Sequence, residues 1–340
     1  MKKNKLKSIY FIKAICALGI ILFHFSCHAQ KSEFLPFYKF ANGDWGAVFV
    51  AVFFMVSGGI LYYNYSSSKI KLKDYYLKRW KSIFPMFYIS YFFFEILYMI
   101  ANKSIFYRGN PLIYIFTLLG IDGYLCSVIP TYYILGEWFI GMIIILYILF
   151  PIVLYFFRKN DKVTFISILL LYIIFLDKPI INPSSYCSIT SSLFSFAIGM
   201  TLIKYKEKIL NTKTLFISIV GILLLTLIKI PISIDLSYHL LGIFIFIFLF
   251  EVGKYIMQNK FLDITFKKIG ELSYAIFLLQ HLTINNVLNY FSPVSTLEAI
   301  LTLIIIIIFT LCGANILTIV TNFIVNKVSL LKNNKKEVSR

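Results

Sequence analysis

The sequence predicts an all-α polytopic membrane protein with about ten transmembrane helices and both termini in the cytosol. The 340 residues are 59% hydrophobic and only 14% charged, with a mean hydropathy of +0.83. This is more apolar surface than a soluble domain can cover. The apolar residues form repeated runs of spanning length. Because the runs do not alternate as in a transmembrane barrel, we expect them to be helices.

The distribution of basic residues gives the topology. The formal net charge is +18, and most of the 33 Lys and Arg residues lie in alternate short loops. Such loops are expected to face the cytosol. The net charge is thereby explained without nucleic acid, since the loops do not build the single basic face of a nucleic-acid binder.

The first half of the chain holds four expected spans. Four lysines precede the first span, about 8–28, and a nearly neutral outer loop leads to the second, about 45–63. Six cations separate the second from the third, about 82–101, which therefore starts in the cytosol. The fourth, about 136–157, ends at further cations. Between the third and fourth, the stretch 102–135 carries only a short apolar piece, so we expect an outer re-entrant or interfacial segment.

The second half holds six more expected spans, in which clusters of lysine again mark the inner turns. These spans are about 163–180, 187–203, 214–233, 236–253, 270–290 and 297–325. We found no repeat and no soluble appendage. The sequence therefore predicts a single membrane-embedded domain over 1–340, with a short cytosolic tail at about 327–340.

Two titratable residues interrupt the first span. Lys13 and His24 are eleven residues apart, which places them on nearly the same helix face and about 16 Å apart along the axis. A titratable side chain within the membrane is costly and indicates a functional site. Lys13 reaching back to the inner interface and His24 serving only in packing are the alternatives. Because histidine suits proton transfer near neutral pH, His24 is our candidate general base. His28, one turn further on, is expected to be interfacial.

Five sequence blocks occur in order along the chain. They are Lys13 and His24 in the first span, FFMVSG at 53–58, KRWKSIFP at 78–85, Trp138-Phe139 with Pro151, and SYAIFLLQH at 273–281. Together they resemble the acyltransferase 3 family of integral membrane acyltransferases. The chain departs from the family pattern by Lys13 in place of Arg, Ala51 in place of an acid, Ser82 in place of a second Arg, and Gln280 in place of His, which here comes one position later.

The resemblance implies transfer of an acetyl (acyl) group from cytosolic acetyl-CoA to a hydroxyl of a cell-surface or capsular polysaccharide. His24 would take the hydroxyl proton as it attacks the thioester. Glu137 would orient that imidazole or bind the sugar, although a helix N-terminus favours an acid in any case. Lys13 would neutralise the donor pyrophosphate or the developing oxyanion.

The remaining expected site residues divide between donor and acceptor. The basic residues Lys78, Arg79 and Lys81 would bind the acyl-CoA phosphates, although topology alone also places cations there. We expect Asp44, Ser57, Trp138 and His281 to contact the acceptor, with an interfacial aromatic belt as the alternative for Trp138. No metal is expected, since the five cysteines lack metal-ligand spacing.

Two other functions stay open from the sequence. A polysaccharide transporter or flippase without covalent chemistry is one, although we see no paired broken helices of the kind such proteins use. A succinyl or N-acyl transferase of the same family is the other. The expected partners are acyl-CoA, an envelope or capsular glycan and the lipid bilayer of the cytoplasmic membrane. A homo-oligomer is left open.

Overall fold

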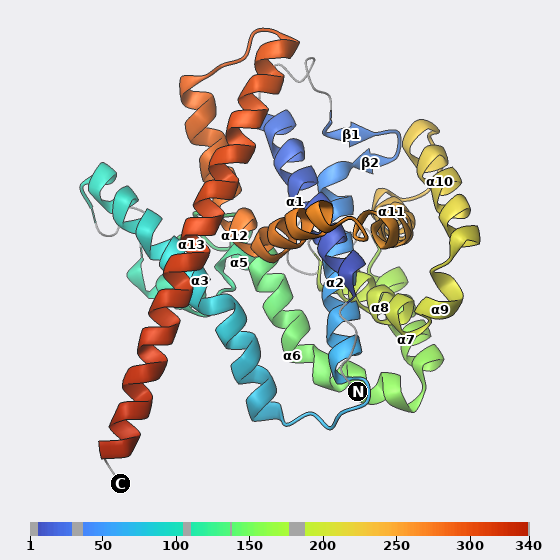
Figure 1. The fold of residues 1–340 in the computed structure, drawn as a ribbon, viewed down its shortest axis with the longest axis horizontal. Coiled ribbons are helices and arrows are strands. Elements are labelled where there is room, and N and C mark those ends of the chain that lie inside the picture. Colours follow the sequence, from blue (N-terminus) through green and yellow to red (C-terminus); the bar gives the residue numbers. More distant parts are fainter. Residues whose placement is uncertain (1–5, 29–36, 105–109, 137, 177–187, 339–340) are drawn as a thin grey trace.

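The computed structural model describes residues 6–28, 37–104, 110–136, 138–176 and 188–338, with side chains up to 327, and this part of the chain is mostly helical (Figure 1). The elements are α1 (Lys7–His28), β1 (Lys39–Phe40), β2 (Gly43–Asp44), α2 (Trp45–Tyr65), α3 (Leu72–Asn102), the 3-10 helix η1 (Pro111–Ile113), α4 (Tyr114–Leu118), α5 (Asp122–Leu125), α6 (Trp138–Lys159), α7 (Asp161–Ile174), α8 (Ile189–Lys204), α9 (Lys206–Ile209), α10 (Thr212–Leu227), α11 (Ile234–Ile256), α12 (Lys260–Tyr290) and α13 (Thr296–Val338).

Helix α1 lies at the centre of the bundle and packs against α2, α11 and α12 (Figure 1). Its apolar side chains are largely buried, and Ile12 and Ile21 are fully so. In contrast to an amphipathic surface helix, α1 is enclosed nearly all round, as an apolar helix in a bundle interior should be. The titratable residues Lys13 and His24 therefore point into protein rather than into lipid.

Helices α2 and α8 approach each other at a backbone contact. A Cβ added to Gly199 would overlap the carbonyl oxygen of Met55, so only glycine fits there. Close approach through small residues is a common way for membrane helices to pack, because dispersion contacts replace the hydrophobic effect in lipid. This contact holds α8 against α2, which itself packs against α1.

The peripheral helices expose apolar side chains, as expected where lipid is the solvent. Helix α13 exposes a row of large residues that includes Ile304, Ile308, Ile319 and Phe323. Within the described residues six helices, α1, α2, α3, α6, α11 and α13, are long and apolar enough to cross a bilayer, and α8 and α10 are shorter apolar helices. The protein is thus a multi-pass membrane protein. The count of ten spans and the cytosolic termini stay predictions.

The expected re-entrant stretch 102–135 holds only short elements in its described part. The longest of them, α4, has five residues, far too few to cross a bilayer. The stretch is tied to α3 by polar contacts at buried positions: the Tyr114 hydroxyl donates to the buried carboxylate of Glu95, and the Tyr91 hydroxyl donates to the carbonyl of Tyr132 at 2.6 Å. Glu95 is therefore held by protein.

Candidate functional site

A cavity of about 250 Å³ lies among α1, α2, α3, α6 and α12. Three of its lining residues, Lys13, Ser57 and Arg79, were expected at the site from the sequence. Among the described residues that line it, none is acidic. Glu271, whose charge acts on Lys13, is exposed and lies outside the lining. The two half-buried cations therefore give the cavity a positive potential, which low-dielectric walls strengthen. The cavity is suited to a ligand with an anionic end.

Arg79 is held at the cavity by its aromatic neighbour. The guanidinium carbon lies 5.4 Å from the ring centre of Tyr147 on α6, within the range of a cation–π interaction. Its Nε is buried and has no hydrogen-bond partner in the described part of the chain. A buried donor without a partner costs free energy, so an anionic ligand reaching this point would supply a missing acceptor.

The other end of the cavity is aromatic. Phe139 of α6 lies with its ring centre 5.0 Å from that of Phe277 on α12 and 6.2 Å from that of Phe53 on α2. All three rings line the cavity. Helices α1 and α12 run side by side in the same direction, because Gly270 lies against Tyr10 and His281 lies against His24. Lys13 is near the start of α1, whereas Phe277 is further along α12, so the cavity lining changes from cationic to aromatic along the bundle axis.

Beyond this aromatic end lie His24, His28 and His281, which we call the histidine cluster. Along α1, His24 follows the cavity residue Ile20 by four residues, and along α12, His281 follows Phe277 by four. Both imidazoles are therefore about 6 Å further along the axis than the last cavity residue of their helix. The ring centres of His24 and His281 are 4.0 Å apart.

The backbone positions the His281 ring. Gly136, just before α6, has φ +82°, and a Cβ there would lie 2.7 Å from Cδ2 of His281. A glycine is thus required both by the left-handed backbone and by the imidazole that packs on it. The ring of His28 is more distant, 6.3 Å from His24 and 6.0 Å from His281 between ring centres, and is exposed.

Four other expected site residues belong neither to the cavity lining nor to the histidine cluster. Lys78 and Lys81 are exposed and do not line the cavity. Asp44 caps α2 by accepting from the backbone N–H of Ala47 at 3.1 Å and also accepts from the Tyr238 hydroxyl at 3.0 Å. Trp138 begins α6 and is half-buried outside the cavity lining.

Glu137 lies outside the described residues, so its expected role stays a prediction.

Sequence reasoning missed several polar cavity residues. Ser273 and Tyr274 line the cavity from α12, and Tyr147 and Ser82 line it from α6 and α3. Ser273 and Tyr274 belong to the block SYAIFLLQH, but only the histidine of that block was expected at the site. Which other members face inward depends on the rotation of α12, and a run of apolar residues does not reveal that rotation.

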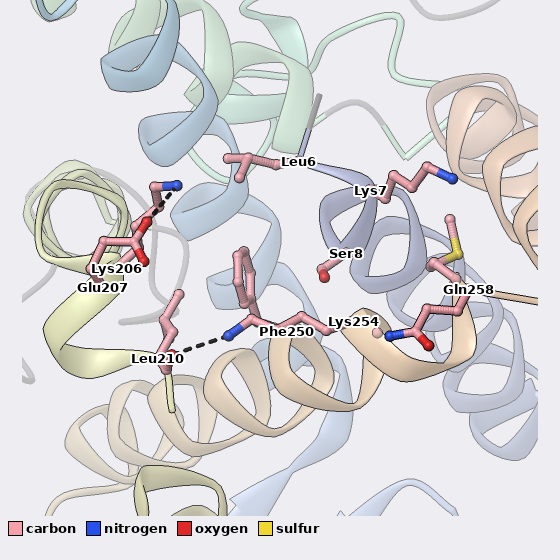
Figure 2. A pocket seen from close by; sticks show the side chains of 11 residues that line it. Leu6, Lys7, Ser8, Lys206, Glu207, Leu210, Phe250, Lys254 and Gln258 are labelled. Carbon is pink, nitrogen blue, oxygen red and sulfur yellow. Dashed lines mark hydrogen bonds and ion pairs between the residues drawn. The ribbon is translucent and has the colours of Figure 1, made fainter. Parts of the chain in front are cut away.

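A second pocket, of about 510 Å³, lies between the start of α1, α9 and the end of α11 (Figure 2). It is larger than the cavity, but its lysines are already engaged. Lys206 pairs with Glu207 at 2.9 Å, and Lys254 donates to the carbonyl of Leu210 at 3.1 Å (Figure 2). Lys254 also pairs with Glu251 at 2.6 Å. Because these charges are balanced, we consider this pocket the weaker candidate for an anionic ligand.

The fourth histidine, His239, has a structural environment. Its Nδ1 lies 2.9 Å from the Ser195 hydroxyl and its Nε2 lies 3.1 Å from that of Ser191, which also donates to Asp235 at 3.1 Å. The cavity beside this network is only about 10 Å³, about the size needed for a single water molecule. Although Ser, His and Asp meet here, no substrate fits.

The helical bundle, its lipid-facing surface and its internal cavity define a membrane protein with an enclosed polar site. Residues 6–319 match the model of the acyltransferase 3 family, which is described as an acyltransferase domain. This is most of the chain, so the protein belongs to that family and is a membrane acyltransferase, which confirms the resemblance carried by the five sequence blocks. No curated protein and no solved structure matched the chain.

Proposed function

We propose that this acyltransferase moves an acetyl group from cytosolic acetyl-CoA to a hydroxyl of a cell-surface or capsular polysaccharide, with His24 as the general base. The observation that carries the proposal is the arrangement along α1. The cationic cavity at Lys13 is followed by an aromatic end and then by His24. Such an order suits a long donor with an anionic head, a thin arm and a reactive thioester at its tip.

The separation along α1 supports one of the two roles expected for Lys13. The backbone positions of Lys13 and His24 are about 16 Å apart along the axis, and side chains on a helix lean toward its N-terminus. The Lys13 side chain therefore leans away from His24, and its ammonium is too far away to stabilise an oxyanion formed there. Electrostatic stabilisation of an oxyanion needs a donor at about 3 Å. We therefore assign Lys13, together with Arg79, to the phosphate-bearing end of the donor, where a planar guanidinium can form paired hydrogen bonds.

The chemical step takes place at the histidine cluster. The acceptor hydroxyl gives its proton to an imidazole nitrogen of His24 while its oxygen bonds to the thioester carbonyl carbon. The tetrahedral intermediate then collapses, the carbon–sulfur bond breaks, and the CoA thiolate takes the proton from the imidazolium. His281, with its ring centre 4.0 Å from that of His24, is placed to orient this ring or to contact the acceptor.

The test uses the full chain in proteoliposomes with labelled acetyl-CoA on one side and glycan from the producing cell on the other. Label should reach the glycan with the wild-type protein and not with His24→Ala. Asn285→Ala serves as the control, because Asn285 is exposed near the same end of α12. Transfer by His24→Ala at the wild-type rate would remove the base assignment, and passage of unlabelled glycan alone would favour a transporter.

The same assay settles the acyl group and the bond formed. Labelled succinyl-CoA competes with acetyl-CoA if the site accepts a longer acyl chain. Release of the label by mild alkali identifies an ester on oxygen, whereas retention identifies an amide on nitrogen.

A further inference from the structure

Three of the chain's four histidines meet at one place. His24 and His28 are four apart on α1, so their side chains leave the same face of that helix one turn apart. His281 comes from the neighbouring helix α12. One ring nitrogen from each residue can be chosen so that all three lie within 4.8 Å of one another. Besides proton transfer, imidazoles serve as the commonest protein ligands of metal ions.

We propose that His24, His28 and His281 together bind one divalent transition-metal ion of the zinc class. Zinc–nitrogen bonds of about 2.0–2.1 Å place tetrahedral ligands about 3.4 Å apart, somewhat closer than the present separation. His28 is exposed at the end of α1 and can rotate to close the difference. Three protein ligands leave a fourth position for water on the exposed side.

The donor set selects the kind of ion. Within the described part of the chain the group contains three imidazoles and neither a carboxylate nor a thiolate. Imidazole nitrogen suits Zn²⁺, Ni²⁺, Co²⁺ and Cu²⁺, whereas Mg²⁺, Ca²⁺ and Mn²⁺ prefer oxygen. The Gly136 backbone against the His281 ring supplies the fixed wall that holds one ligand in place.

One consequence rests on the proposed function. Metal ligation uses the same imidazole lone pair that His24 needs to accept the acceptor proton. An ion bound at the cluster and general-base catalysis by His24 are therefore mutually exclusive, and added Zn²⁺ should inhibit acyl transfer. Metal binding itself is independent of acetyl-CoA and of the glycan, so it can be measured whether or not the proposed reaction is correct.

The binding test uses the full chain in nanodiscs, without an affinity tag that contains histidine, stripped of metal by a chelator. Co²⁺ is the probe, because its visible absorption reports tetrahedral nitrogen coordination, and Zn²⁺ should displace it. We expect one Co²⁺ per chain. Loss of a supporting residue outside the metal ligands typically costs 10–100-fold in metal affinity, so His28→Ala and His281→Ala should each weaken binding at least about tenfold, while Asn285→Ala should not.

The outcomes are distinct. One ion per chain with weaker binding in both histidine variants establishes the site. Binding that is substoichiometric, or equal in all variants, overturns it. Because His28 is exposed, His28→Ala is expected to fold, and thermal unfolding of each variant checks this. Stoichiometric metal binding without inhibition of acyl transfer would overturn the competition with His24 while leaving the site intact.

Discussion

Replacing Arg79 by alanine tests the donor end of the site most directly. Among the described residues, the buried Nε of Arg79 has no hydrogen-bond partner, and Arg79 and Lys13 are the two cations that line the cavity. A hydrogen bond to a charged group contributes about 1.5–3 kcal/mol. At about 1.4 kcal/mol for each factor of ten, Arg79→Ala should weaken acetyl-CoA binding by about 10- to 150-fold.

The effect should appear in KM rather than in kcat. Arg79 is expected to hold the phosphate-bearing end of the donor equally well in the ground state and in the transition state, and loss of such uniform binding raises KM alone. Arg79→Lys keeps the charge but loses the planar set of donors, so it should recover part of the affinity.

The assay is initial-rate transfer from labelled acetyl-CoA at increasing concentration, at two salt concentrations. Lys73→Ala is the matched control, since Lys73 is exposed at the start of the same helix α3 and does not line the cavity. A KM for Arg79→Ala that equals the KM for Lys73→Ala would refute the assignment. So would a loss confined to kcat, because that result would place Arg79 at the reacting atoms.

Three further results are expected. His24→Gln should lower kcat by about 10²–10⁴-fold, the usual contribution of general acid–base catalysis, with KM for acetyl-CoA nearly unchanged. A rise in KM with kcat unchanged would contradict this. Gly199→Ala should destabilise the fold by about 1–3 kcal/mol through overpacking, seen as a lower thermal midpoint, whereas Gly313→Ala, whose Cβ would meet only a flexible side-chain atom at 3.2 Å, should have little effect. The hydrogen bond from the Tyr205 hydroxyl to Asp161 raises the pKa of Tyr205 above its usual value. This hydrogen bond should therefore stabilise the fold fully below about pH 10, and the stabilisation should be lost at higher pH as the phenol ionises. Tyr205→Phe should remove this alkaline dependence of the thermal unfolding midpoint.

The sequence located most helices but misjudged some of their ends. The expected spans 8–28 and 45–63 correspond closely to α1 (Lys7–His28) and α2 (Trp45–Tyr65). In contrast, α3 begins at Leu72 and α12 at Lys260, whereas the expected spans begin at about 82 and 270. Hydropathy marks the part of a helix that lies in lipid, whereas the helix itself continues into water as long as its backbone bonds and residue propensities allow.

The site was predictable along α1 and less so across helices. Lys13 and His24 stand out because charge in an apolar run is conspicuous. In the basic block of α3, however, Arg79 faces the cavity while Lys78 and Lys81 do not. Residues 79, 82 and 83 share a face because they are three and four apart, but the sequence does not reveal that this face turns inward. The approach of His281 to His24 likewise depends on packing between α1 and α12.

The aromatic end of the cavity has a consequence for the membrane as a barrier. Under the proposed function, a cytosolic donor must meet an acceptor on the other side of the bilayer, yet an open route would let protons and ions leak. The rings of Phe53, Phe139 and Phe277 line the cavity, and Phe277 lies four residues before His281 on α12. Ions would have to shed their hydration shells to pass between these rings, whereas an uncharged acyl-bearing arm would not. Under the proposed function, the three rings would limit ion leakage while leaving a path for the arm of the donor.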